Sequence, residues 1–225
     1  MVYITGDTHI PVDIAKLNSK QFPAQKDLSK DDFLIICGDF GGVWNNDNEE
    51  LYWRKWFEQK SFTTLFIDGN HENFHLLNQF EIVDFAGGKA HKISNSIYHL
   101  MRGEIYEIDD KRIFTFGGAS SHDKEYRVKD KNWWEEELPS HQELETAVSN
   151  LDASGRVVDY IITHCAPSSV QKRISSNYTQ DILTDFFEEV KNKTTFDKWF
   201  FGHYHLDITI DKKFSCLFNH IEKLF

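Results

Sequence analysis

Five short apolar runs in this chain each end at a polar motif, and this pattern constrains the fold more than any other feature. The runs cover residues 2–5, 32–37, 63–68, 160–163 and 198–201. Short apolar runs bounded by turn residues predict buried strands. Side chains just past the carboxyl ends of such strands gather at one edge of an α/β sheet. We therefore expect on one rim the motifs Gly6-Asp7-Thr8-His9, Gly38-Asp39-Phe40-Gly41-Gly42, Gly69-Asn70-His71-Glu72, Thr163-His164 and Gly202-His203-Tyr204-His205.

The segments between these runs favour an α/β fold with a second, antiparallel sheet region. Apolar residues at spacings of three and four predict helices near residues 49–59, 74–79, 140–151 and 179–190. Ser140 and Glu143 match a capping box at the start of the third helix. Alternating segments around two turns predict hairpins, which would pair 105–108 with 112–116 and 207–210 with 214–218.

Size and charge bound the classes of function. The chain has 225 residues, 40% of them hydrophobic, which is enough for one sizeable core. We expect a single domain over residues 1–225. A formal net charge of -11, from 36 Asp and Glu against 25 Lys and Arg, disfavours broad nucleic-acid binding.

Cysteine usage and the N-terminus predict the compartment. The chain has three cysteines, an odd number, at positions 37, 165 and 216, and no two of them form a Cys-x-x-Cys pair. This favours a reducing environment for the protein and a packing role for Cys37, Cys165 and Cys216. The N-terminus lacks a basic segment, and no stretch approaches the roughly 18 apolar residues of a membrane span. We therefore expect a cytoplasmic protein without a membrane partner.

The motifs supply oxygen and imidazole ligands for two divalent metal ions. In an extended strand end, residues i and i+2 point the same way, so Asp7 and His9 could share an ion, as could His203 and His205. Asp39 is the candidate to bridge two ions through its two carboxylate oxygens. Carboxylate, amide and imidazole ligands without thiolates suit Mn²⁺, Fe²⁺ or Zn²⁺.

Such a centre predicts hydrolysis of a phosphate ester. Two cations about 3.5–4 Å apart lower the pKa of a bridging water and neutralise charge on a phosphoryl group. If Asn70 coordinates a metal, His71 projects beside the cavity and can protonate the leaving oxygen, with Glu72 orienting its ring.

The five motifs, in this order and spacing, resemble the calcineurin-like metallophosphoesterase superfamily, and the resemblance runs from Gly6 to His205. It implies a four-layer α/β/β/α sandwich of two mixed β-sheets flanked by helices. It further implies that His71 stands outside the metal coordination as proton donor. The implied ligands are Asp7, His9, Asp39 and His205 for one ion, and Asp39, Asn70, His164 and His203 for the other.

Two comparisons within the superfamily refine this resemblance. Protein Ser/Thr phosphatases carry an Asp-Arg pair after the second Gly-Asp, whereas this chain continues Phe40-Gly41-Gly42-Val43-Trp44, which argues against a phosphoprotein phosphatase. Residues 117–127, followed by Trp133-Trp134, resemble a bacterial and phage branch of uncharacterised metallophosphoesterases.

Residues outside the five motifs are candidates for substrate contacts. Lys124 and Arg127 could meet a phosphate, and Trp133, or its neighbour Trp134, could stack on a base, although a packed loop with solvated charges is the plainer alternative. We assign Trp44, Trp53 and Trp56 to the core, since the last two fall at helical spacing.

Three functional alternatives remain open at this point. A phosphomonoesterase or phosphodiesterase acting on a small phosphorylated metabolite or nucleotide is the main prediction. A nucleotide or dinucleoside polyphosphate hydrolase needs the same centre. A catalytically silent metal-binding scaffold is the non-enzymatic alternative, although none of the seven expected ligands is substituted.

Overall fold

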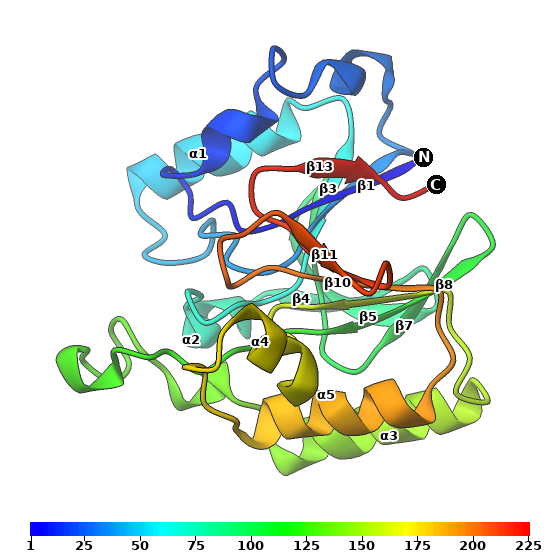
Figure 1. Ribbon diagram of the computed structural model, residues 1–225. Coiled ribbons are helices and arrows are strands. Elements are labelled where there is room, and N and C mark those ends of the chain that lie inside the picture. Colours follow the sequence, from blue (N-terminus) through cyan, green and yellow to red (C-terminus); the bar gives the residue numbers. More distant parts are fainter.

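Two mixed β-sheets lie face to face in the computed structural model, which describes residues 1–225 (Figure 1). The first sheet has the order β13-β1-β2-β3-β6-β5-β4 and the second β11-β12-β10-β9-β8-β7. The first comprises β1 Val2–Thr5, β2 Phe33–Ile36, β3 Thr63–Phe66, β4 Glu81–Phe85, β5 Gly88–Ser94, β6 Ile97–Leu100 and β13 Ile221–Lys223. The second comprises β7 Ile105–Ile108, β8 Lys111–Phe116, β9 Tyr160–Thr163, β10 Lys198–Phe201, β11 Ile208–Ile210 and β12 Phe214–Cys216.

Parallel strands form the centre of each sheet. In the first, β1, β2, β3 and β6 run parallel, and in the second β8, β9, β10 and β12 do. The five predicted strands are all present, and β7 with β8 and β11 with β12 form the two predicted hairpins. Because the central strands of each sheet share a direction, their carboxyl ends meet at one edge.

Helices cover the two outer faces and complete the predicted four layers (Figure 1). Helix α1 (Asn48–Glu58) packs Phe57 onto the first sheet, among Leu34, Ile36 and Phe66. Helices α3 (His141–Ala153), α4 (Ser168–Ile174) and α5 (Ile182–Lys193) cover the second sheet. Between the sheets, buried aliphatic side chains such as those of Ile35 and Ile162 form the central core.

Helix boundaries depart from the predicted ones where capping side chains set them. Ser140 and Glu143 form the expected capping box of α3. Helix α5 starts three residues later than expected, because Asp181 and Thr184 form a capping box of their own. Helix α2 (Phe74–Leu77) is a single turn, and the short α4 was not predicted.

The three cysteines are free and buried, in agreement with a packing role. Cys37 lies in the core between the sheets, and Cys165 and Cys216 lie in the core beneath α3 and α5. None of the helices combines the length and the apolar character that crossing a membrane requires.

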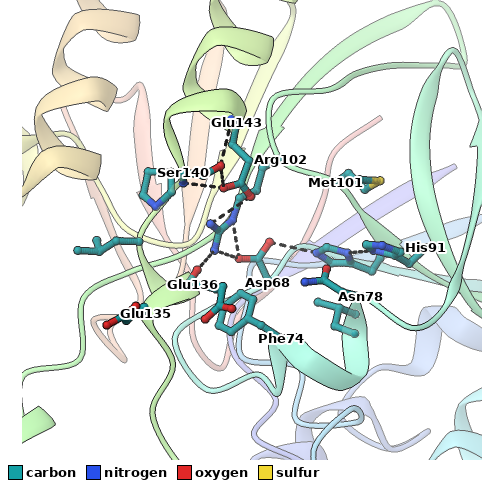
Figure 2. A pocket seen from close by; sticks show the side chains of 14 residues that line it. Asp68, Phe74, Asn78, His91, Met101, Arg102, Glu135, Glu136, Ser140 and Glu143 are labelled. Atoms are coloured by element: carbon teal, nitrogen blue, oxygen red, sulfur yellow. Dashed lines mark hydrogen bonds and ion pairs between the residues drawn. The ribbon is translucent and has the colours of Figure 1, made fainter. Parts of the chain in front are cut away.

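A buried ion pair between Asp68 and Arg102 ties the end of β3 to the loop after β6, and Arg102 also reaches Glu143 on α3 (Figure 2). Arg102 donates from Nε and Nη2 to Asp68 Oδ2, at 2.9 and 2.6 Å, and its Nη1 lies 3.3 Å from Glu143 Oε1. The other Asp68 oxygen lies 3.1 Å from His99 Nε2, which shares a hydrogen bond with His91 through the two Nδ1 atoms. These partners compensate the charge of a carboxylate that is only 1% exposed.

Replacing Arg102 should therefore destabilise the fold. In Arg102→Met the buried Asp68 carboxylate loses its cation, and we expect the free energy of unfolding to fall by about 3–5 kcal/mol. Urea denaturation measures this change. Arg173→Met, which removes an exposed pair with Asp211, is the control and should change stability by about 0.5 kcal/mol or less; equal losses in the two variants would contradict the role of the buried pair.

Candidate metal centre

The seven predicted ligands come from the carboxyl ends of five strands, three in the first sheet and two in the second. Asp7 and His9 follow β1, Asp39 follows β2 and Asn70 follows β3. The second sheet contributes the remaining three from the loops after β9 and β10, which are His164, His203 and His205. The two edges face each other, so residues almost 200 positions apart lie in contact.

Asp39 Oδ2 lies between two imidazole nitrogens. It is 3.1 Å from His9 Nε2 and 3.4 Å from His164 Nε2. The other oxygen, Oδ1, accepts a hydrogen bond from the backbone N–H of His71 at 2.8 Å. Asp39 is 2% exposed and forms no ion pair with Lys or Arg, so only imidazole groups face its charged oxygen.

The other ring nitrogen of each imidazole has a partner of its own. His9 Nδ1 lies 2.8 Å from Asp13 Oδ2, and His164 Nδ1 lies 2.7 Å from the carbonyl oxygen of Cys37. Because both partners are acceptors, each Nδ1 carries the proton and the Nε2 of a neutral ring offers a lone pair to the centre. Acceptors bonded to the far nitrogen of the ring hold metal-ligating histidines in orientation.

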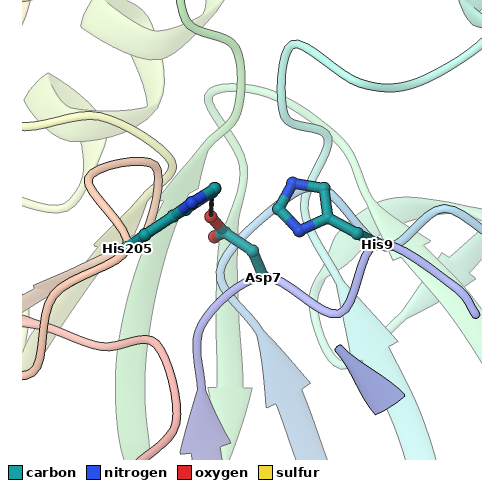
Figure 3. A group of neighbouring side chains, drawn as sticks. All are labelled: Asp7, His9 and His205. Carbon is teal, nitrogen blue, oxygen red and sulfur yellow. Dashed lines mark ion pairs between the residues drawn. The ribbon is translucent and has the colours of Figure 1, made fainter. Parts of the chain in front are cut away.

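Asp7, His9 and His205 form a second group that could hold a cation (Figure 3). One potential ligand atom from each residue lies within 4.8 Å of the others, and His205 Nε2 is 3.2 Å from Asp7 Oδ2. His9, Asp39 and His71 satisfy the same criterion. Asp7 is fully buried, and its carboxylate, like that of Asp39, forms no ion pair with Lys or Arg.

Asn70, His164 and His203 lie on the other side of Asp39. Asn70 Oδ1 is 3.2 Å from His164 Nε2, while its Nδ2 donates to Ser121 Oγ. The rings of His164 and His203 make an edge contact with centroids 5.0 Å apart. His203 and His205 therefore face different parts of the centre and do not converge on one ion.

The backbone at the ligands differs from the extended strand ends that the sequence suggested. His9, Asp39, His203 and His205 have φ angles of 34°, 47°, 66° and 51°, in the left-handed region. Non-glycine residues rarely adopt this conformation, and it concentrates at functional sites. The turn after each strand, rather than an i and i+2 alternation, aims these side chains.

Glycines precede several ligands because the opposing side chain leaves no room for a Cβ. A Cβ at Gly69 would overlap Asp39 Oδ1, and one at Gly202 would overlap Asp7 Oδ1. Each carboxylate therefore packs against the backbone of another motif, which explains why glycine recurs at these positions.

The donor set fits divalent cations. Asp7, Asp39 and Asn70 bring oxygen lone pairs close to imidazole Nε2 atoms, and no side-chain N–H other than those of histidines reaches them. Without cations, burial lowers the pKa of His164, but the attraction of Asp39 and Asp7 outweighs it and raises the pKa to about 10. The buried carboxylates thus favour a positive charge next to them, and a metal ion would supply it in place of the proton on the imidazole.

His71 and Glu72 have separate roles in the structure. His71 Nδ1 lies 3.2 Å from Arg127 Nη1. Burial and the charge of Arg127 lower the pKa of His71, against the attraction of Asp39. The sequence suggested that Glu72 orients the His71 ring, but the structure shows otherwise. Glu72 is fully buried and accepts a hydrogen bond from the backbone N–H of Phe40, which fixes the turn after β2.

The three predicted substrate contacts lie on the loop before α3. Arg127 reaches His71 and is held by Asp123 through Nε at 2.6 Å. Lys124 Nζ is 5.3 Å from the Trp133 ring centroid and 4.0 Å from Glu137 Oε2. Arg127 therefore lies beside the centre, whereas Lys124 and Trp133 contact each other.

The sequence reasoning missed several residues around the centre. Asp13 and Ser121 contact His9 and Asn70, and the His122 ring lies 5.8 Å from that of His203. Ser121 and His122 belong to the segment that resembles the bacterial and phage branch. Trp53 and Trp56 pack against the core of the first sheet, as expected, whereas Trp44 does not. Trp44 and Trp53 are only partly buried and line a cavity beside His9 and His71.

Comparison with known families agrees with this geometry. The model of the calcineurin-like phosphoesterase family matches residues 1–207 of the chain. The protein belongs to this family and is, in general terms, a metal-dependent phosphoesterase. None of the curated proteins matches the chain.

Cation binding should stabilise the protein, because it compensates two buried carboxylates that no Lys or Arg neutralises. At Mn²⁺ concentrations about 100 times the dissociation constant we expect about 2.7 kcal/mol of added stability, a rise of roughly 5–10 °C in Tm. Differential scanning calorimetry of metal-stripped protein measures it. Asp39→Asn should lose most of the shift and the exposed control Asp152→Asn should keep it; the same rise in both variants would contradict the assignment of Asp39.

Proposed function

We propose that this protein hydrolyses a phosphomonoester or phosphodiester at a dinuclear metal centre, with His71 as the proton donor to the leaving group. The ligands would be Asp7, His9, Asp39 and His205 for one ion and Asp39, Asn70, His164 and His203 for the other. When bound, two divalent cations lower the pKa of water and neutralise phosphoryl charge.

The position of Asp39 is the observation that carries this proposal. One carboxylate oxygen of Asp39 lies within 3.4 Å of the Nε2 atoms of His9 and His164, which come from different sheets. The other nitrogen of each ring, Nδ1, is bonded to an acceptor of its own. A bridging carboxylate needs a lone pair directed to each side. Both imidazole nitrogens face Oδ2, while Oδ1 accepts the His71 N–H, so Asp39 would bridge through one oxygen and not through the two that the sequence suggested.

Arg127 supports the role of His71 by fixing where its proton resides. A guanidinium group can only donate hydrogen bonds, so His71 Nδ1 must be the acceptor. The proton of the neutral ring then resides on Nε2, the atom that is free to donate to a leaving oxygen. Arg127 also brings a positive charge to the edge of the centre, where a phosphate oxygen could contact it.

Metal-restored hydrolysis tests the proposed activity. We expect metal-stripped protein to regain cleavage of 4-nitrophenyl phosphate or of its bis-ester when Mn²⁺ is added, as followed by nitrophenolate absorbance. The preferred compound separates a monoesterase from a diesterase. Asp39→Asn should abolish turnover with the fold intact by circular dichroism. Full activity of Asp39→Asn would refute the bridging role, and inactivity of the metal-loaded wild type on both esters would favour the silent scaffold.

The leaving group decides how much the proton of His71 matters. For His71→Asn we expect kcat on an alkyl ester to fall by about 10²–10⁴, because the alkoxide must be protonated as it leaves. The loss on a 4-nitrophenyl ester should be much smaller, since nitrophenolate is a stable anion. Steady-state kinetics on both esters measures the difference, with the exposed His141→Asn as control. Equal losses on the two esters would show that His71 does not act as an acid.

A further inference from the structure

A cavity of about 300 Å³ opens directly beside His9 and His71. Its walls come from the loop after β1, the loop between β2 and α1, and the first turns of α1. Trp44 and Trp53 supply its aromatic surface, and Asp47 and Glu49 supply carboxylates. Its volume lies at the lower end of the range of small-ligand pockets, about 300–1,000 Å³.

Both indole rings are held in place by other aromatic residues. Trp44 makes an edge contact with Trp134 at a centroid distance of 5.0 Å, and Trp53 does so with Trp56 at 5.6 Å. Trp134 is almost fully buried, so the Trp44 ring rests on a fixed surface. Rings held in this way present preformed faces on which a flat group can stack.

The charge of the cavity is negative. No Lys or Arg lines it. Glu50 is occupied within the protein, because it pairs with Arg54 and its Oε2 accepts from the backbone N–H groups of residues 44–46. Asp47 caps α1 through one oxygen, and Glu49 is exposed and forms no ion pair. An anion entering here would meet two carboxylates and no Lys or Arg side chain.

The proposed mechanism determines what occupies this cavity. In an in-line displacement the leaving oxygen must face its proton donor, so the leaving group lies on the His71 side of the phosphoryl group. The phosphoryl group itself would remain among the metal ligands, where Arg127 adds positive charge. The cavity beside His71 is therefore the space into which the leaving alcohol extends.

Resting on the proposed function, we propose that this cavity binds the leaving group and selects a flat organic alcohol without negative charge, such as a nucleoside. Trp44 and Trp53 stack on its ring, and Asp47 and Glu49 accept hydrogen bonds from its hydroxyl or amino groups. The same carboxylates repel a leaving group that carries phosphate. The natural substrate is then a phosphate ester of a neutral or cationic alcohol that carries an aromatic ring. This excludes dinucleoside polyphosphates, whose leaving group carries phosphate.

Three synthetic esters that differ only in the leaving alcohol test this inference. They are benzyl, 4-carboxybenzyl and propyl phosphate, or their methyl diesters if the protein prefers diesters. For the Mn²⁺-loaded wild type we expect kcat/KM to be highest for the benzyl ester. Trp44→Ala should reduce the ratio of benzyl to propyl by about tenfold, and Trp44→Phe should restore most of it.

Charge reversal provides a second, independent variant. Glu49→Lys should raise the ratio of 4-carboxybenzyl to benzyl about tenfold, because it replaces repulsion by attraction near the ring. Glu145→Lys, an exposed change of equal charge on α3, should leave that ratio unaltered. Ratios that stay at their wild-type values in both Trp44→Ala and Glu49→Lys would overturn the inference.

A binding measurement separates this inference from the proposed function. Saturation-transfer NMR on the metal-free protein should show contact with benzyl alcohol, weaker contact with 4-(hydroxymethyl)benzoate, and loss of the benzyl alcohol signal in Trp44→Ala. If the metal-loaded protein cleaves none of the esters but this binding pattern holds, the proposed hydrolysis fails and the cavity assignment stands. Equal signals from wild type and Trp44→Ala would overturn the cavity assignment whatever the activity.

Discussion

The carboxylate of Asp39 is the point at which the two sheets are joined at their functional edge. It receives the His71 N–H from the loop after β3 and faces His9 from the loop after β1 and His164 from the loop after β9. A charge buried to this extent costs several kcal/mol unless cations or hydrogen bonds compensate it. The loops that carry His9, His71 and His164 surround this carboxylate. The geometry of the whole rim therefore depends on which groups compensate its charge.

Strain at the rim follows from the same constraint. Four candidate ligands, at positions 9, 39, 203 and 205, have positive φ, which costs about 1–3 kcal/mol each when the residue is not glycine. The central core between the sheets and the buried pair of Asp68 and Arg102 provide the surrounding stability that keeps such conformations in place. Stable parallel strands end at this rim, and the turns that follow them place positive φ on four of the residues that would meet the metals.

The sequence was sufficient to predict the five strands that end at motifs and the two hairpins, and to place the seven candidate ligands on one rim, because each apolar run ends at its motif. It did not predict β4, β5, β6 or β13, which complete the first sheet. It failed where the outcome depends on contacts between distant segments. The i and i+2 argument for His203 and His205 assumed an extended backbone, whereas their positive φ turns the rings apart. Glu72 is next to His71 in sequence, yet it binds the Phe40 N–H from another loop. Asp13 and Ser121 lie outside the five motifs, and only the fold brings them to His9 and Asn70.

Trp44 illustrates how a residue assigned to packing acquires a second role. Its neighbours Asn45 and Asn46 turn around Glu50, whose carboxylate gathers three backbone N–H groups and is itself neutralised by Arg54. This turn leaves Trp44 only partly buried, against Trp134, and facing the cavity that His71 borders. Helical spacing accounts for Trp56, but it carries no information about a tryptophan in the preceding loop. In the proposed mode of binding, the selectivity of the centre would depend on a buried glutamate, because Glu50 determines where the aromatic surface lies.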